Sequence, residues 1–210
     1  SVNLEYYDEW KDDTHFIDDL MRMLDNVLSY FIKHAPAHLW RAVASAKAER
    51  SVGLGAMGFH SYLQRIGIGL NSPMSYGINK KIFKHIYDKA LESNFALGKV
   101  RGEPEDMKGS GKRFAHMLAI APNASSSIIC GRVSPSIEPL RANAFTQKTM
   151  SGSFLVKNKY LEKLLEEKGK NTKDVWKTII SSRGSVDALD FLTPQEKNIF
   201  KTAIEVDQAW

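Results

Sequence analysis

A polar turn in the middle of the sequence carries residue types that bind anions. In "LAIAPNASSSII" an apolar segment ends at Pro122, and residues 123–127 follow it. Asn and Ser are preferred where helices begin, and the first amides of a helix have no partner within it. These amides, three serine hydroxyls and the positive end of a helix dipole would together suit a diphosphate. Ordinary helix capping with nothing bound explains the same residues, so the turn alone leaves both interpretations open.

The segment "GLGAMG", from Gly53 to Gly58, matches the G-x-G-x-x-G pattern of loops that bind dinucleotides. Such a loop needs a strand before it, a helix after it and an acidic residue about twenty positions later to hold the ribose. The stretch beyond Gly69, "LNSPMSYGINKK", has no Asp or Glu. We therefore predict a tight strand-to-helix turn, in which glycines permit positive φ and close packing of the backbone.

Other residues with reactive side chains are isolated in the sequence. His34 and His38 are four residues apart, but Pro36 lies between them and interrupts the helix that would align them. Glu138 lies between prolines without an acidic partner, which favours a structural role, accepting backbone N–H groups, over acid–base catalysis. The lone cysteine, Cys130, cannot form an internal disulfide or a dithiol redox pair. We predict no catalytic residue and no metal ligand in this chain.

Apolar spacing, together with Gly and Pro, predicts the elements that position these residues. The predicted helices cover residues 12–36, 38–50, 56–67, 75–102 and 193–210, and the predicted strands cover 50–55 and 116–122, the second of them buried. Asp13 or Thr14 can cap the first helix. Its predicted inward face comprises Phe16, Ile17, Leu20, Met23, Leu24, Val27, Leu28 and Phe31. Residues 123–147 are rich in Ser, Pro, Gly and Asn, which predicts loops with one helical turn and one short strand; the remainder reads as helical. The last helix starts with a capping box at Thr193, Pro194 and Glu196 and has no stop signal before Trp210.

Composition places the chain among ordinary globular proteins. The predicted strands alternate with predicted helices, which indicates the mixed α/β class. No apolar run approaches the roughly 18 residues of a membrane helix, and the acidic N-terminus is unlike a signal peptide. We therefore expect a cytoplasmic location and no membrane partner. The formal net charge is only +5. Lys alternates with Glu over residues 157–177, which favours a solvated helix face over a basic docking surface, so no direct contact with nucleic acid is predicted.

Four segments, taken in order, resemble a known family. They are "RSVGLGAMGFHSYL", "LAIAPNASSSIICG", "SPSIEPLRANAF" and "TMSGSFLVKNKYLEKLL". Together they resemble the C-terminal half of the large, catalytic subunit of class I ribonucleotide reductase, in the version encoded by T-even-like phages. The resemblance implies a portion of a ten-stranded α/β barrel, rich in helices, and reduction of ribonucleoside diphosphates by thiyl-radical chemistry. It implies that the substrate diphosphate binds the turn formed by Pro122, Asn123, Ala124, Ser125 and Ser126, with Ser127 adjacent.

The resemblance also implies what this chain lacks. The radical cysteine and the two substrate-reducing cysteines would precede Ser1, and the radical-path tyrosines and the tail dithiol would follow Trp210. We expect residues 1–210 to be a single segment of the barrel domain, incomplete at both ends. Barrel strands and helices would occupy about residues 1–150, and a helical part would occupy about residues 151–210. Alone, this segment is expected to be inactive.

The implied partners follow from the same family. They are the remaining part of the large subunit, a separate small subunit with a di-iron tyrosyl radical, a ribonucleoside diphosphate and thioredoxin or glutaredoxin. No cofactor is expected in this chain, and a phage-encoded protein would work in the host cytoplasm. Two alternatives stay open: a relative that takes its radical from adenosylcobalamin or a glycyl radical, and a non-catalytic assembly or binding module.

Overall fold

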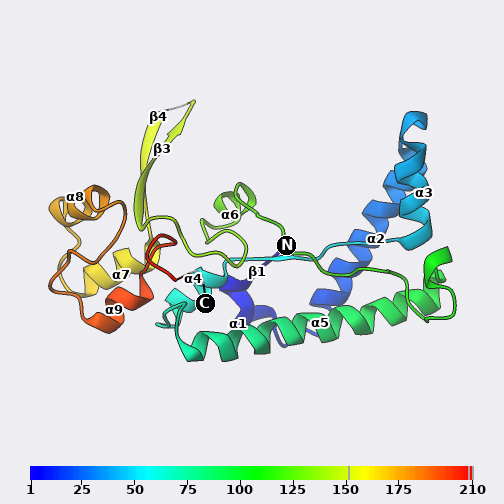
Figure 1. Cartoon of the computed structure of the whole chain (residues 1–210), viewed down its shortest axis with the longest axis horizontal. Coiled ribbons are helices and arrows are strands. Elements are labelled where there is room, and N and C mark those ends of the chain that lie inside the picture. Colours follow the sequence, from blue (N-terminus) through cyan, green and yellow to red (C-terminus); the bar gives the residue numbers. More distant parts are fainter. Residues whose placement is uncertain (151, 208, 210) are drawn as a thin grey trace. The chain divides into compact units, whose positions relative to one another are not determined.

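The computed structural model describes residues 1–210 except Ser151, Gln208 and Trp210, and it describes Lys148 and Thr149 without their side chains. The chain divides into two compact units, each built from separate stretches of sequence (Figure 1). The first unit comprises residues 1–2, 6–56 and 79–121, and the second comprises residues 3–5, 57–78 and 122–210.

Helices dominate both units, as predicted. In the first unit lie α1 (Tyr7–Trp10), α2 (Phe16–His34), η2 (Ala37–Leu39), α3 (Trp40–Glu49), η3 (Glu105–Met107) and most of α5 (Pro73–Arg101). In the second unit lie α4 (Phe59–Arg65), α6 (Ser126–Ile129), β3 (Ala144–Thr149), β4 (Gly152–Lys157), α7 (Lys159–Glu167), α8 (Lys173–Ser181) and α9 (Pro194–Ile199). Two very short strands, β1 (Val2–Asn3) and β2 (Ala56–Met57), pair with each other, and η1 (Leu4–Tyr6) follows β1.

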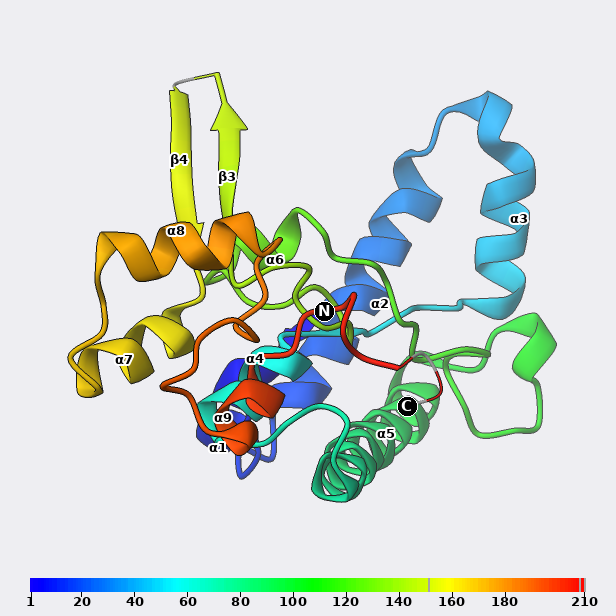
Figure 2. The same ribbon diagram turned by 60° about the vertical axis from the view of Figure 1, so that its left-hand side comes forward.

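Helix α2 confirms the predicted helix but not the whole of its predicted buried face. Its buried positions are Ile17, Met21 and Asp25, spaced four residues apart. Met23 and Val27, which we expected to pack inward, are 52% and 60% exposed. Helices α2 and α3 lie side by side, and Figure 2 shows them from a second direction.

The N-terminus of α2 also differs from the prediction. Asp13 or Thr14 was expected to cap the helix, but His15 precedes its first residue without a capping hydrogen bond from its side chain. The Asp13 carboxylate instead accepts a hydrogen bond from the His15 amide at 2.9 Å. Asp13 thus stabilises the turn before the helix.

A buried ionic cluster joins α2 to the rest of the first unit. The Asp25 side chain is buried, and its carboxylate accepts hydrogen bonds from Arg50 at 2.6 Å, Arg101 at 2.6 Å and Arg113 at 3.1 Å. Arg50 ends α3 with φ of 47°, a left-handed conformation that turns the chain there. One carboxylate thereby links segments that are far apart in the sequence.

The two predicted strands of the first unit are mostly extended loop. Val52 and Leu54 donate backbone hydrogen bonds to His116 and Met117, both at 2.9 Å, in a parallel arrangement. The regular ladder is a single bridge between Leu54 and Leu118. The second segment is not buried as predicted: Ile120 is 56% exposed.

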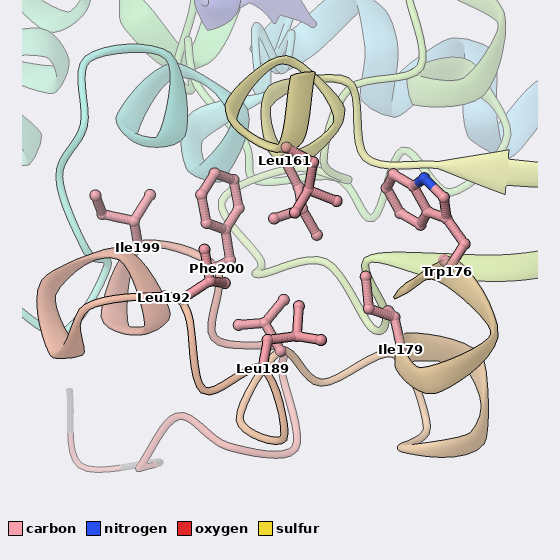
Figure 3. Close-up of a cluster of buried hydrophobic side chains, with 10 residues drawn as sticks. Leu161, Trp176, Ile179, Leu189, Leu192, Ile199 and Phe200 are labelled. Atoms are coloured by element: carbon pink, nitrogen blue, oxygen red, sulfur yellow. The ribbon is translucent and has the colours of Figure 1, made fainter. Parts of the chain in front are cut away.

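The second unit has its own apolar core (Figure 3). Helices α7 and α8 contribute Leu161, Trp176 and Ile179 to it, and the other labelled members are Leu189, Leu192, Ile199 and Phe200. The Thr172 hydroxyl caps α8, and the Asn158 side chain caps α7 by accepting from the amides of Tyr160 and Leu161. The core thus fixes where α7, and the residues just before it, lie.

A β-hairpin replaces part of the predicted helical region. Strands β3 and β4 pair antiparallel, with Ala144 opposite Lys157 and Thr149 opposite Gly152. Gly152 has φ of 135°, which favours glycine at the turn, and "SFLV" after it is a sequence that suits a strand. The expectation that everything after residue 150 is helical is therefore wrong for β4.

The last predicted helix begins as expected and ends early. Thr193 and Glu196 form the capping box, and Pro194 occupies the first turn. However, α9 stops at Ile199, because the chain turns again at Thr202. The Glu205 carboxylate accepts hydrogen bonds from the Thr202 amide at 2.8 Å and hydroxyl at 2.6 Å. The predicted continuation to Trp210 is wrong through residue 206, and Trp210 itself lies outside the described residues.

None of the helices in the described part of the chain combines the length and the apolar character needed to cross a membrane.

Candidate diphosphate-binding site

The predicted anion-binding turn belongs to the second unit and surrounds the start of α6. Asn123 adopts φ of 52°, and its carbonyl accepts a hydrogen bond from the Ser127 amide at 3.0 Å. The Ser127 side chain is buried, and its hydroxyl lies 3.3 Å from the Ala124 carbonyl. Asn123, Ala124 and Ser127 therefore define the turn itself.

Of the three serines in the turn, Ser125 and Ser126 are exposed to solvent. Within the described part of the chain, neither their amides nor their hydroxyls form hydrogen bonds. Pro122 and Ala124 are also exposed. The expected convergence of three hydroxyls is thus reduced to two, because that of Ser127 faces inward. Since α6 has only four residues, its dipole adds little, and local amides carry the attraction.

A cavity of about 250 Å³ lies beside this turn. Ala124 and Ser127 contribute to its wall, and aromatic and aliphatic side chains provide much of the remainder. Four cationic residues also line it: Arg132, Arg141, Lys157 and Lys159. Cations beside exposed amides favour a ligand that carries negative charge next to an apolar or ring-shaped portion.

A reciprocal pair of hydrogen bonds supports the cavity floor. The Ser61 amide donates to the Ser134 hydroxyl at 3.1 Å, and the Ser134 amide donates to the Ser61 hydroxyl at 2.8 Å. Three residues before Ser61, the Gly58 amide donates to the Ser134 carbonyl at 2.8 Å. These bonds attach the start of α4 to the loop that follows α6.

The glycines of "GLGAMG" serve packing and turning, as predicted. Gly58 has φ of 79° at the start of α4, and a Cβ atom there would lie 2.8 Å from the Asn3 side chain. Within the first unit, a Cβ at Gly53 would lie 2.9 Å from the Cβ of Ala119, and one at Gly55 would lie 2.5 Å from the Ala119 carbonyl oxygen. The three positions thus require glycine for steric reasons.

Gly58→Ala should destabilise the second unit more than Gly67→Ala does. Both glycines have positive φ, which costs an L-residue about 1–2 kcal/mol. At Gly67 a new methyl group would meet no atom within 4 Å, whereas at Gly58 it would crowd Asn3. Urea unfolding of both variants measures the difference, and equal losses would show that the contact with Asn3 has no cost.

A buried polar network lies behind the cavity. The Asn158 amide group donates to Gln64 at 3.0 Å and to Asn143 at 2.8 Å. Asn143 in turn donates to the Phe200 carbonyl at 2.7 Å. His60 accepts from the Leu140 amide at 3.1 Å, and burial lowers its pKa to about 4, so that its ring is neutral at pH 7.

The other reactive residues show no catalytic or metal-binding arrangement among the described residues. Helix α2 ends at His34, so His34 and His38 do not share a helix, as predicted. Glu138 is exposed, and its carboxylate accepts no backbone hydrogen bond from the described residues, contrary to the structural role expected of it. Cys130 is exposed at the end of α6. Among the described residues, no group of three or more His, Cys, Asp and Glu side chains could hold a metal ion.

Neither the cationic residues of the cavity wall nor the buried polar network was predicted from the sequence. Lys157 and Lys159 lie in a Lys-rich stretch that was interpreted as a solvated helix face. The hairpin, which was not predicted, places Lys157 against the cavity, and the start of α7 places Lys159 there. The Asn158 that lies between them was a recognisable helix cap, but its long-range partners could not be inferred from spacing.

The chain belongs to the ribonucleotide reductase family. Its sequence matches the model of the ribonucleotide reductase barrel domain over residues 1–110 and 104–210. The helix-rich architecture with few strands is that of a partial α/β barrel, which confirms the predicted fold class. The chain corresponds to a segment of the reductase's large subunit.

Similar proteins agree on this assignment. The large subunit of ribonucleoside-diphosphate reductase from Invertebrate iridescent virus 6 is 51% identical over all of this chain, which spans 22% of the relative. The same subunit from Invertebrate iridescent virus 3 is 52% identical over 99% of this chain and 34% of the relative. A solved structure, the class Id ribonucleotide reductase alpha subunit of Actinobacillus ureae, superimposes with a TM-score of 0.88 at 43% identity. It covers 96% of this chain, which spans 37% of that structure.

Proposed function

We propose that this chain supplies the substrate diphosphate-binding turn of a ribonucleoside-diphosphate reductase. The observation that carries the proposal is the pair Ser125 and Ser126, which are exposed and whose amides and hydroxyls have no partner among the described residues. The residues on either side of the pair, Ala124 and Ser127, line a cavity with cationic residues in its wall. Backbone amides at such a turn bind phosphate oxygens without needing a lysine. Family membership adds a substrate with the matching group, because the named relatives act on ribonucleoside diphosphates.

Each residue of the turn has a distinct part in the proposal. Pro122 ends the extended segment, and Asn123 reverses the chain with its positive φ. Ala124 and Ser127 close the turn through their hydrogen bond. Ser125 and Ser126 then donate to the phosphate oxygens. Lys157 and Lys159 already pair with Glu162 and Glu5, so Arg132 and Arg141, which form no ion pair among the described residues, attract the ligand's negative charge.

The whole enzyme would reduce ribonucleoside diphosphates to deoxyribonucleoside diphosphates by thiyl-radical chemistry. Since Cys130 is the sole cysteine of this chain, the redox thiols must belong to other parts of the large subunit. We propose that the isolated chain is inactive and works with that remaining part and with thioredoxin or glutaredoxin. The radical would come from a separate small subunit with a metal cofactor, a di-iron tyrosyl radical in our proposal. This assembly would operate in the cytoplasm of the host.

Replacing Ser125 and Ser126 together by Ala should weaken nucleoside diphosphate binding about thirtyfold. The two hydroxyls are lost, each worth about 1 kcal/mol as a hydrogen bond, while the amides remain. Titration followed through the amide signals of residues 123–127 measures the affinity and places the ligand. The matched control is Ser181→Ala, an exposed serine on α8. Unchanged affinity in the double variant, or a wild-type titration that moves no signal in the turn, would contradict the proposal.

A further inference from the structure

The proposed turn is held at its far end by residues from two other segments of the second unit. The Asn3 side-chain amide donates to the Cys130 carbonyl at 3.0 Å. The Lys159 ammonium group lies 3.2 Å from the Gly131 carbonyl. These two carbonyls directly follow α6, so the helical turn is fixed opposite to the end where Ser125 and Ser126 present their amides.

Both donors are themselves fixed in place. The Asn3 side-chain oxygen, Oδ1, accepts a hydrogen bond from the Glu5 backbone amide at 3.0 Å, which orients the side-chain nitrogen toward Cys130. The buried Glu5 carboxylate lies 2.5 Å from the Lys159 ammonium group and also accepts from the Tyr160 hydroxyl. These hydrogen bonds and this ion pair therefore restrict the position of the loop after α6.

The close approach of Gly58 restricts Asn3 further. A Cβ at Gly58 would lie 2.8 Å from Asn3 Oδ1, and one at Gly131 would lie 3.8 Å from Asn3 Nδ2. The last glycine of "GLGAMG" thus leaves the space that Asn3 fills. Gly58 belongs to a motif that resembles a dinucleotide-binding loop, yet through Asn3 it helps to support the turn of residues 122–127.

We propose that Asn3 is a positioning residue for the diphosphate-binding turn, and that Lys159 assists it. Asn3 does not contact the phosphates; it aligns α6 so that the amides of Ser125 and Ser126 point at one place. A four-residue helix cannot hold its own direction, since so short a helix is marginal without tertiary contacts. This inference rests on the proposed function, because it concerns the same turn.

The variant Asn3→Asp tests the inference with little change in shape. Aspartate keeps the oxygen that accepts from the Glu5 amide, but it presents a second acceptor to the Cys130 carbonyl and so removes the bond. We expect the affinity for inorganic pyrophosphate and for a nucleoside diphosphate to fall by the same factor, about tenfold. The amide signals of Ser125 and Ser126 should also shift in the absence of ligand.

The matched control is Asn171→Asp. Asn171 likewise accepts through its oxygen, from the Trp176 ring nitrogen, and donates through its nitrogen, to Glu166. It should keep both affinities and the signals of the turn. If Asn3→Asp does not fold, Lys159→Met carries the test, because methionine cannot donate to the Gly131 carbonyl. The amide signals of Ser125 and Ser126 in the absence of ligand are then the deciding measurement, and unchanged signals would overturn the positioning role.

The possible outcomes separate the two proposals. A wild-type chain that binds no pyrophosphate at the turn would overturn the proposed function. A wild-type chain that binds there, with Asn3→Asp binding equally well, would overturn the positioning role alone. A variant whose unfolding midpoint falls while its affinity and turn signals stay unchanged would also overturn it, because Asn3 would then serve stability only.

Discussion

Asp25→Asn should lower the free energy of unfolding by about 3–5 kcal/mol, the range for breaking a buried ion pair from one side. The substitution preserves shape but removes the charge that three guanidinium groups share. Arg50 and Arg113 would stay close together in a mostly buried place without a counterion, since their side chains are only 9% and 13% exposed. Such a cluster should open locally or unfold.

The charge state of Asp25 supports the size of this effect. Burial raises its pKa, but hydrogen bonds from Arg101 and Arg50 and the charges of Arg50 and Arg113 more than compensate, so the pKa is lowered overall. The carboxylate is therefore ionised at neutral pH and contributes its full charge. Arginine cannot lose its proton to relieve the imbalance, because its pKa remains far above neutral.

Urea unfolding at pH 7 measures the loss, with Asp19→Asn as the control. Asp19 lies on the same helix but is exposed, so the control variant should change the unfolding free energy by less than about 0.5 kcal/mol. A loss at Asp25 no larger than at Asp19 would mean that the cluster is solvated or separates without cost.

The Asp25 cluster also shows which contacts cannot be predicted from the sequence. Apolar spacing predicted α2 correctly, because a periodicity of three to four residues is a local property. It could not reveal that Asp25 faces inward while Met23 and Val27 face out, since that depends on arginines up to 88 positions away. Burial of a charge is decided by its partners, and partners distant in sequence leave no local signal.

The candidate site follows the same pattern. Residues 122–127 were predicted to form a turn because they are small and polar. No acidic residue that could hold a ribose follows "GLGAMG", and the glycines were therefore predicted to serve a tight turn and close packing. The hydrogen bond between Asn3 and Cys130 joins residues 127 positions apart, so spacing could not predict it. The hairpin was missed because its sequence has both strand and helix features, and pairing of the two strands decides between them.

Lowering the pH from 7 to 4 should reduce the stability of the second unit by about 3 kcal/mol through His60 alone. Burial lowers the folded-state pKa of this ring from 6.5 to about 4. The unfolded state therefore binds more protons between these two values, and each unit of pKa difference corresponds to about 1.4 kcal/mol. The contribution of the neutral His60 ring to stability is fully present above about pH 7 and is lost as the pH falls toward 4.

Burial is the main reason why His60 resists protonation, and the hydrogen bond at its Nδ1 atom acts in the same direction. The Leu140 amide donates to its Nδ1 atom at 3.1 Å, so the neutral ring carries its proton on Nε2. A backbone hydrogen bond with Ile199 favours the proton on the ring and so works against burial, but burial is the larger effect. A second proton on Nδ1 would face the Leu140 N–H group, and two donors cannot share one hydrogen bond.

The variant His60→Asn separates this effect from general acid denaturation. Asparagine offers an oxygen near the place of Nδ1 that can accept from Leu140, and it does not titrate in this range. Its unfolding free energy should therefore fall less steeply than that of the wild type between pH 7 and pH 4. His38→Asn, which changes an exposed histidine, should retain the wild-type slope. If His60→Asn retains that slope as well, the buried ring does not cause the acid sensitivity, and the network behind the cavity must accommodate a charged histidine.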